Sequence, residues 1–324
     1  MTIQSSPRLD SAAKTRFSPA MLYPLVFRPV FKERVWGGRE MERLYRKSLP
    51  PGAPIGESWE ISDQGDNLSV VANGPLAGRT LRSLMEERPE ELLGDVPLMA
   101  NGRFPLLVKI LDARERLSLQ VHPPAEAAAI LGGEPKTEMW FVAQADPGAT
   151  LCAGLKRGVT RRQFEAALAR QELEPLVHKL SPRAGDALFV PSGRLHAIGA
   201  GLVIFEIQQN SDTTYRVYDW GRPREVHVEQ SLQCIDFKDF EPSLADAREE
   251  VLVACEQFVC ARLKLDAPRP LRCNDSFHII GAIEGAVAIG DVPLAAGQFA
   301  LAPASLGKFT LRPRGQATVL DVFV

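Results

Sequence analysis

Cysteine is scarce in this chain. The 324 residues include five cysteines, an odd number, and no two of them form a C-x-x-C pair. A disulfide framework usually uses an even set of cysteines, so this pattern favours reduced thiols and a cytoplasmic location. The five positions are scattered along the chain: Cys152, Cys234, Cys255, Cys260 and Cys273.

The chain also lacks an excess of charge and a long apolar run. Its 38 Lys and Arg residues nearly balance 40 Asp and Glu residues, which argues against a nucleic-acid or membrane-surface partner. No apolar run is long enough to cross a bilayer. Residues 1–21 are polar and rich in Ser, Pro and Ala, without the apolar centre of a secretory signal. We predict that they form a disordered lead-in.

The chain does contain many short apolar runs bounded by Gly, Pro and Asp, for example FPLLVKIL, DALFVPSG, GLVIFEIQQ and ATVLDVFV. Such runs predict a mainly β fold, arranged as a sandwich or barrel. Helices are few. The clearest covers residues 159–173, where Thr160 and Gln163 form a capping box, and weaker patterns cover residues 80–94 and 226–235.

The length and one polar segment predict two domains. A chain of 324 residues is long enough for about two domains. The segment 236–250, DFKDFEPSLADAREE, is charged, contains a proline and separates two β-rich blocks. We therefore expect one domain over residues 22–240, with helical insertions, and a second over residues 241–324.

The stretch LSLQVHPP places Gln120 and His122 two residues apart in an apolar run. On a strand, both side chains point to the same face, while Leu119 and Val121 point to the other. A metal ion would explain the pair. Taken alone, however, the short pattern is better explained by a buried histidine that forms ordinary hydrogen bonds.

A longer motif downstream favours the metal. The stretch GDALFVPSGRLHAIG has the form G-x5-P-x-G-x2-H and ends at His196, which is the second cupin motif, and KTEMWFV would supply the carboxylate of the first through Glu138. Two imidazoles, a carboxylate and an amide suit a borderline divalent ion, and with one water they suit Zn²⁺. The predicted ligands are Gln120, His122, Glu138 and His196.

The C-terminal block repeats the motif without its chemistry. In GQFALAPASLGKF, Gly297 and Pro303 keep their places, but Ser305 replaces the second glycine and Lys308 replaces the histidine. A protonated lysine is a poor zinc ligand. We therefore expect two cupin barrels, the second without metal.

Seven segments together resemble one family. From about Leu22 to Val324, the chain resembles the type I mannose-6-phosphate isomerases of the cupin superfamily, in particular their short bacterial form. The resemblance rests on VWGG, GESWEIS, LVKILDA, LSLQVHP, PKTEMW, LHAIGAG and EIQQNSDTTYRVYDWGR.

The resemblance implies an enzyme that interconverts mannose 6-phosphate and fructose 6-phosphate, with one zinc ion per chain held by the four predicted ligands. It also implies that Lys136 and Arg216 handle the substrate or take part in catalysis. Larger members have HAY where this chain has HAI. That departure leaves the general base unassigned.

Aldose–ketose isomerisation moves a proton between C1 and C2 through an enediol, so it requires a base and groups that stabilise negative charge. Lys136 and Arg216 could neutralise the intermediate or hold the phosphate. The further candidates for substrate binding are Glu57, Trp59, Glu206 and Tyr215. Either glutamate could carry a proton or simply pair with a lysine. The other histidines, His178, His227 and His278, are expected to be structural.

Two alternatives remain open from the sequence. A cupin with two histidines and a carboxylate can hold Fe²⁺ and act as an oxygenase, or the chain can be a non-catalytic sugar-binding regulator. Gln120 as a fourth ligand argues against the first, and the absence of a helix-turn-helix pattern argues against the second. We expect a small hexose phosphate as ligand and a monomer or small homo-oligomer.

Overall fold

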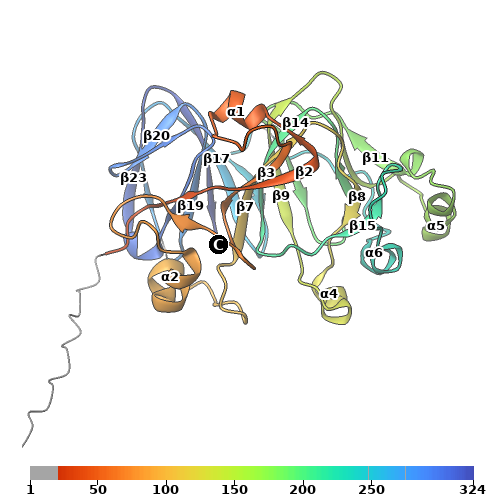
Figure 1. Ribbon diagram of the computed structural model, residues 1–324, viewed down its shortest axis with the longest axis horizontal. Helices are drawn as coiled ribbons and strands as arrows, with labels where there is room; N and C mark the ends of the chain where they lie inside the picture. The colour runs from red at the N-terminus through yellow and green to blue at the C-terminus, as the bar shows by residue number, and fades with distance from the viewer. Residues whose placement is uncertain (1–20, 247, 274) are drawn as a thin grey trace, which may run out of the picture.

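The computed structural model describes residues 21–246, 248–273 and 275–324. The lead-in predicted at residues 1–21 lies outside this part of the chain except for Met21. The described fold is mainly β, as predicted, and its strands form two groups that lie side by side (Figure 1).

The first group consists of two antiparallel sheets from the N-terminal and central parts of the chain. The six-stranded sheet has the order β12 (Ala187–Val190), β9 (Glu138–Ala145), β14 (Leu202–Gln209), β7 (Leu106–Ala113), β2 (Val30–Gly38) and β3 (Ile55–Ile61). The five-stranded sheet has the order β11 (Val177–Leu180), β10 (Leu151–Leu155), β13 (His196–Ile198), β8 (Leu119–Val121) and β15 (Tyr215–Tyr218).

The second group is formed mostly by residues after 250. Its seven-stranded sheet has the order β16 (Val251–Ala254), β17 (Val259–Leu265), β24 (Ala317–Phe323), β19 (His278–Glu284), β22 (Phe299–Ala302), β1 (Leu25–Arg28) and β6 (Val70–Val71). Its four-stranded sheet has the order β18 (Arg269–Arg272), β23 (Lys308–Pro313), β20 (Ala286–Ile289) and β21 (Val292–Ala295). The N-terminal strand β1 thus pairs with the C-terminal part of the chain, and the domain division at residue 240 stays a prediction.

A short hairpin and six short helices complete the described fold. The hairpin joins β4 (Asp63–Gln64) and β5 (Asn67–Leu68). The longest helix, α5 (Arg161–Ala169), has nine residues and carries the predicted capping box of Thr160 and Gln163. No helix among the described residues could span a membrane. The others are α1 (Glu40–Tyr45), α2 (Leu81–Glu87), α3 (Pro89–Leu93), α4 (Ala125–Leu131) and α6 (Val228–Cys234), with 3₁₀ turns at Glu174–Leu176 and Ala304–Leu306.

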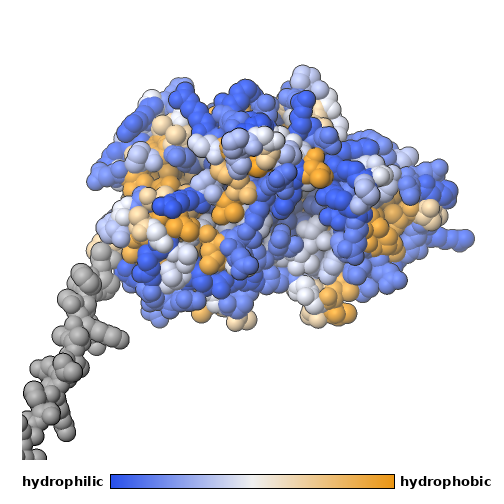
Figure 2. All heavy atoms as spheres, in the orientation of Figure 1, coloured by the Kyte–Doolittle hydropathy of each residue, from blue (hydrophilic) through white to orange (hydrophobic). Residues whose placement is uncertain are grey.

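The sequence predicted three of these helical regions. The pattern at residues 80–94 corresponds to α2 and α3, and the pattern at residues 226–235 corresponds to α6. Helices α4, α5 and α6 lie together at the end of the molecule away from the second group of sheets (Figure 1). Hydrophobic side chains gather on the surface over α5 and α6, whereas most of this face is hydrophilic (Figure 2).

Strand β7 lies at the centre because both of its faces are covered. All eight of its residues are buried. Val108 and Ile110 belong to the apolar core shared with the second group of sheets, whereas Leu111 belongs to the core between the first two sheets. Lys109 alternates with these residues and faces the same interior as Leu111. This interior holds the candidate site.

Candidate active site

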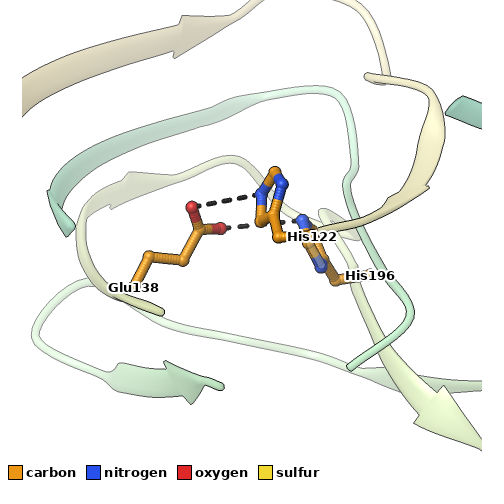
Figure 3. A group of neighbouring side chains, drawn as sticks. All are labelled: His122, Glu138 and His196. Carbon is orange, nitrogen blue, oxygen red and sulfur yellow. Dashed lines mark ion pairs between the residues drawn. The ribbon is translucent and has the colours of Figure 1, made fainter. Parts of the chain in front are cut away.

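Three strands bring the predicted metal ligands together. His196 on β13 is paired with Gln120 on β8, and His122 follows directly after β8. Glu138 begins β9 in the opposite sheet. Ligand atoms of His122, Glu138 and His196 all lie within 4.8 Å of one another, and all three residues are buried (Figure 3).

Backbone carbonyls fix how the two histidine rings are oriented. Nδ1 of His122 lies 3.0 Å from the carbonyl oxygen of Thr213, and Nδ1 of His196 lies 2.8 Å from that of Arg194. A carbonyl oxygen only accepts hydrogen bonds, so each neutral ring carries its proton on Nδ1 and keeps a lone pair on Nε2. The Nε2 atoms face Glu138, at 3.3 Å for His122 and 3.6 Å for His196.

Burial keeps both rings neutral. Burial, followed by the neighbouring Lys136 ammonium, lowers the pKa of His122 to about 3. Burial also lowers the pKa of His196. The amide Nε2 of Gln120 lies 3.2 Å from Nε2 of His196, so the fourth predicted ligand belongs to the same group. Neutral imidazoles are the form that binds metals.

The carboxylate of Glu138 is fully buried, and neither oxygen has a hydrogen-bond partner in good geometry. Nζ of Lys136 lies 2.9 Å from Oε2 of Glu138 and 3.1 Å from Nε2 of His122. Burial alone would raise the pKa of Glu138, but the positive charge of Lys136 lowers it well below the usual value. A buried carboxylate facing two lone pairs is stable only beside positive charge. The donor set therefore fits a divalent cation.

A cavity of about 390 Å³ opens beside this group. Gln120 and Lys136 form part of its wall, and Arg216 on β15 enters from the strand paired with β8. Nε of Arg216 is buried without a hydrogen-bond partner, and one terminal nitrogen donates to the carbonyl of Glu225. Burial, followed by the nearby Arg224, lowers the pKa of Arg216. Among the described residues, Arg216 forms no ion pair.

Glu206 on β14 also lines the cavity. One of its carboxylate oxygens lies 3.3 Å from Nζ of Lys109, and the other accepts a hydrogen bond of 3.0 Å from Nε1 of Trp140. Burial and the negative charge of Glu138 raise the pKa of Glu206. Because a carboxyl group with a raised pKa exchanges protons more easily near neutral pH, Glu206 is equipped to carry a proton.

Glu57 lines the cavity and forms an ion pair with Arg34. It accepts hydrogen bonds from Nε of Arg34 at 2.8 Å and from Nε1 of Trp59 at 2.6 Å. Burial would raise the pKa of Glu57, but Lys109 and Arg34 lower it overall. Glu57 is thus held ionised. Trp59 is buried and does not line the cavity itself, but its hydrogen bond orients the Glu57 carboxylate.

The structure places Tyr215 elsewhere. It alternates with Arg216 along β15 and packs on the outer face of the sheet, where its ring meets that of His227 at 6.0 Å. The neighbouring aromatic residues Tyr218 and Trp220 lie in the same outer cluster. The aromatic ring at the cavity is that of Trp36 on β2.

The cavity residues that sequence reasoning missed include Lys109, Trp36, Arg34 and Arg224. Lys109 carried a usable signal, because a lysine in the middle of the apolar run LLVKIL needs a buried partner. Trp36 lies within VWGG, which was noted only for its resemblance. Arg34 and Arg224 look like ordinary surface arginines in the sequence, and only the folded chain shows that they line the cavity.

The other histidines have structural surroundings. Nδ1 of His227 accepts a hydrogen bond of 3.1 Å from the backbone N–H of Arg216. His278 lies in the second group of sheets, with Nδ1 2.7 Å from a carboxylate oxygen of Asp321. His178 lies on β11, and Lys308 is exposed at the start of β23. The only group of metal-ligating residues found in the described part of the chain is that of His122, Glu138 and His196.

The fold and the buried group define a mainly β protein of the cupin type with a candidate metal site between two sheets. Residues 25–147 match the family model "Phosphomannose isomerase type I, catalytic domain". The chain is 34% identical to mannose-6-phosphate isomerase ManA of Bacillus subtilis over 91% of this chain and 98% of that protein. It is 39% identical to mannose-6-phosphate isomerase of Streptococcus mutans over 66% of this chain and 68% of that protein.

Solved structures agree with these matches. The structure resembles that of mannose 6-phosphate isomerase from Bacillus subtilis with a TM-score of 0.84 and 32% identity, over 94% of this chain and 100% of that one. A putative mannosephosphate isomerase from Archaeoglobus fulgidus has the same fold, with a TM-score of 0.77 at 24% identity, over 94% of this chain and 99% of that one. The chain belongs to the type I phosphomannose isomerase family.

Proposed function

We propose that the protein interconverts mannose 6-phosphate and fructose 6-phosphate. Family membership supports this activity, since relatives that align over most of the chain are named mannose-6-phosphate isomerases. The observation that carries the proposal is the buried group of His122, Glu138 and His196 beside a cavity that Arg216 enters without an ion-pair partner among the described residues. A metal-type donor set next to a free guanidinium suits a small anionic sugar.

One zinc ion would be held by Gln120, His122, Glu138 and His196. Two imidazoles with a carboxylate and an amide are ligands that zinc accepts, and the backbone carbonyls that fix both rings act as the outer shell such a site needs. When bound, the ion would supply a positive charge that polarises the carbonyl group of the open-chain sugar.

The proton step requires a group that can both take and return a proton. In the isomerisation, a base removes the proton from C2 of the open-chain aldose, giving an enediol, and a proton is then delivered to C1 of the ketose. We assign this transfer to Glu206, since it lines the cavity and its pKa is raised. Trp140 and Lys109 hold its carboxylate in place.

Arg216 and Lys136 are assigned to the negative charges of the substrate. The planar guanidinium of Arg216 can hold two oxygens at once, which suits a phosphate or an enediolate. Lys136 is paired with Glu138, whose negative charge it offsets, and it lines the cavity, so we assign it to the oxygens of the bound sugar. Glu57, kept ionised by Arg34, is assigned to a sugar hydroxyl.

We also propose a cytoplasmic protein that works as a monomer or small homo-oligomer. All five cysteines carry free thiols, which supports a reducing compartment.

The metal content of purified protein, measured by elemental analysis beside an isomerase assay, tests this assignment. The wild type and Lys308→Ala should each hold about one zinc per chain and convert mannose 6-phosphate, because Lys308 lies outside the site. The double variant His122→Ala, His196→Ala should lose both the metal and the activity, since two of four ligands are gone. Stoichiometric zinc in that double variant, or iron in place of zinc in the wild type, would contradict the proposal.

A further inference from the structure

We propose that Arg194 and Asp239 are positioning residues for the metal group, whose ion pair fixes the carbonyl that orients His196. This inference rests on the proposed function, because it assigns residues to the same metal site. Neither residue lines the cavity, and Asp239 belongs to the charged segment 236–250 that the sequence presented only as a domain boundary.

The Arg194 side chain is held at three points. Its Nε and one terminal nitrogen each donate to a different carboxylate oxygen of Asp239, both at 2.8 Å, and the other terminal nitrogen donates to the carbonyl of Phe189 at 2.6 Å. Both partners of the ion pair are largely shielded, with 13% and 16% of their side chains exposed. A two-pronged pair in this environment restricts both partners strongly.

Asp239 is itself anchored to the five-stranded sheet. Its carbonyl accepts a hydrogen bond of 2.9 Å from the backbone N–H of Leu155 on β10, the strand that pairs with β13. Gly154 also passes so close that a Cβ there would lie 2.8 Å from the same carbonyl oxygen. The carboxylate that holds Arg194 therefore has a fixed position relative to the strand that carries His196.

The backbone of the same turn contacts both metal-type histidines. The carbonyl of Arg194 accepts from Nδ1 of His196 at 2.8 Å, and the N–H of Gly193 donates to the carbonyl of His122 at 2.8 Å. The carbonyl of Gly193 in turn accepts from the N–H of Asp236 at 2.9 Å. Gly193 has a φ of +88°, which a residue with a side chain rarely adopts. The turn and the segment 236–239 thus form one unit.

Loss of the ion pair should release the Arg194 carbonyl. The His196 ring would then lose the acceptor that fixes its Nδ1, and Nε2 would no longer be held toward Glu138. Loss of such outer hydrogen-bond partners typically weakens metal binding by about 10- to 100-fold. A merely structural ion pair would lower the stability of the fold and leave the metal affinity of folded protein unchanged.

Zinc affinity of purified, folded protein, measured by competition with a chromogenic chelator, tests the inference. Asp239→Asn keeps the size and shape of the side chain, so it should fold even where Arg194→Met does not. We expect either variant to bind zinc about 10- to 100-fold more weakly than the wild type. The visible spectrum of the cobalt-loaded protein should change as well, because it reports the geometry of the ligands.

Lys47→Met is the matched control, since Lys47 forms an ion pair of the same length, 2.8 Å, with Glu60 away from the metal group, and that pair is even more deeply buried. It should lower the melting temperature and leave zinc affinity unchanged. Wild-type zinc affinity in folded Asp239→Asn, or an equal loss in Lys47→Met, would overturn the inference alone. A wild type that binds no zinc would overturn both this inference and the proposed function.

Discussion

Arg216 differs from the other cationic side chains around the cavity because it forms no ion pair with a carboxylate among the described residues. Lys136 faces Glu138, Lys109 faces Glu206 and Arg34 faces Glu57. Within the described part of the chain, the Arg216 side chain donates only to a backbone carbonyl, and its buried Nε has no hydrogen-bond partner. A buried donor without a partner is costly, so this side chain is the one best prepared to bind an anion.

Arg216→Lys should therefore impair catalysis even though it keeps the charge, because the planar fork is lost. We expect a penalty of about 2–4 kcal/mol in kcat/KM if the guanidinium stabilises the developing charge. Steady-state kinetics on zinc-verified protein separates the roles: a fall in kcat places Arg216 at the enediolate, and a rise in KM alone places it at the phosphate. Wild-type constants in both Arg216→Lys and Arg216→Ala would exclude it from the site. Arg161→Lys, at an exposed arginine, is the control.

Glu206→Gln tests the proton step. The amide keeps the hydrogen-bonding shape but cannot carry a proton, so kcat should fall by about 10²- to 10⁴-fold with metal content unchanged. In the wild type, activity should be lost as the pH falls through the raised pKa of Glu206, above the range of an ordinary glutamate. The exposed Glu165→Gln should behave like the wild type. Undiminished kcat in Glu206→Gln would remove it from the mechanism.

At the scale of elements, the sequence was most informative where a motif and a strand coincide. The alternation in LSLQVHPP and the turn in VPSGRLH predicted which side chains of β8 and β13 share a face, and the structure brings them together. The sequence was least informative about which side chains meet between a sheet and the element packed on it. The outward position of Tyr215 depends on which face of β15 is covered by α6, and no local pattern encodes that.

The side chain of Asp112 joins strand β7 to helix α1, and its titration should make the stability of the fold depend on pH. Asp112 accepts a hydrogen bond of 2.6 Å from the backbone N–H of Glu40 at the start of α1. Burial nevertheless raises its pKa to about 6. Between about pH 4 and pH 6, the folded state therefore keeps a proton on Asp112 that the unfolded state has released. The resulting contribution to the free energy of unfolding is fully present below pH 4 and is lost as the pH rises through 6.

Asp112→Asn should remove that dependence while keeping an acceptor for Glu40. Between pH 4 and pH 7, the free energy of unfolding of the wild type should fall relative to that of Asp112→Asn by up to about 3 kcal/mol. Urea unfolding of both proteins across this range measures the difference, and other titrating groups cancel in the comparison. A difference that stays constant with pH, or that grows in favour of the wild type, would refute the assignment.

At the scale of the whole molecule, the six-stranded and seven-stranded sheets share one apolar core. Phe205 on β14 is fully buried there, and its ring meets those of Tyr45, Phe141 and Phe299 at 5.4, 6.4 and 5.6 Å. Strand β1 adds a covalent link, since it precedes the first group of sheets in the chain and pairs in the second. The second group therefore supports the outer face of β7, and this fixes the position of the strand whose inner face carries Lys109.

Phe205→Ala should destabilise the molecule by about 3–5 kcal/mol, the usual cost of removing a buried aromatic side chain. Because the core is shared, thermal unfolding should remain a single transition that moves to lower temperature. Differential scanning calorimetry can check both points. Phe237→Ala, at a half-buried ring against Phe164, should cost clearly less. Two separated transitions, with only one shifted, would show that the two groups of sheets unfold independently.

The central claim joins the metal group to sugar isomerisation, and turnover of mannose 6-phosphate before and after metal removal tests it most directly. Fructose 6-phosphate formation is followed in a coupled assay on native protein, on protein treated with a chelator and dialysed, and on that protein after zinc is restored. We predict conversion by the native protein, loss of nearly all turnover with the metal, and recovery on adding about one equivalent of zinc. Full turnover by metal-free protein, or no conversion by protein that holds stoichiometric zinc, would contradict the account.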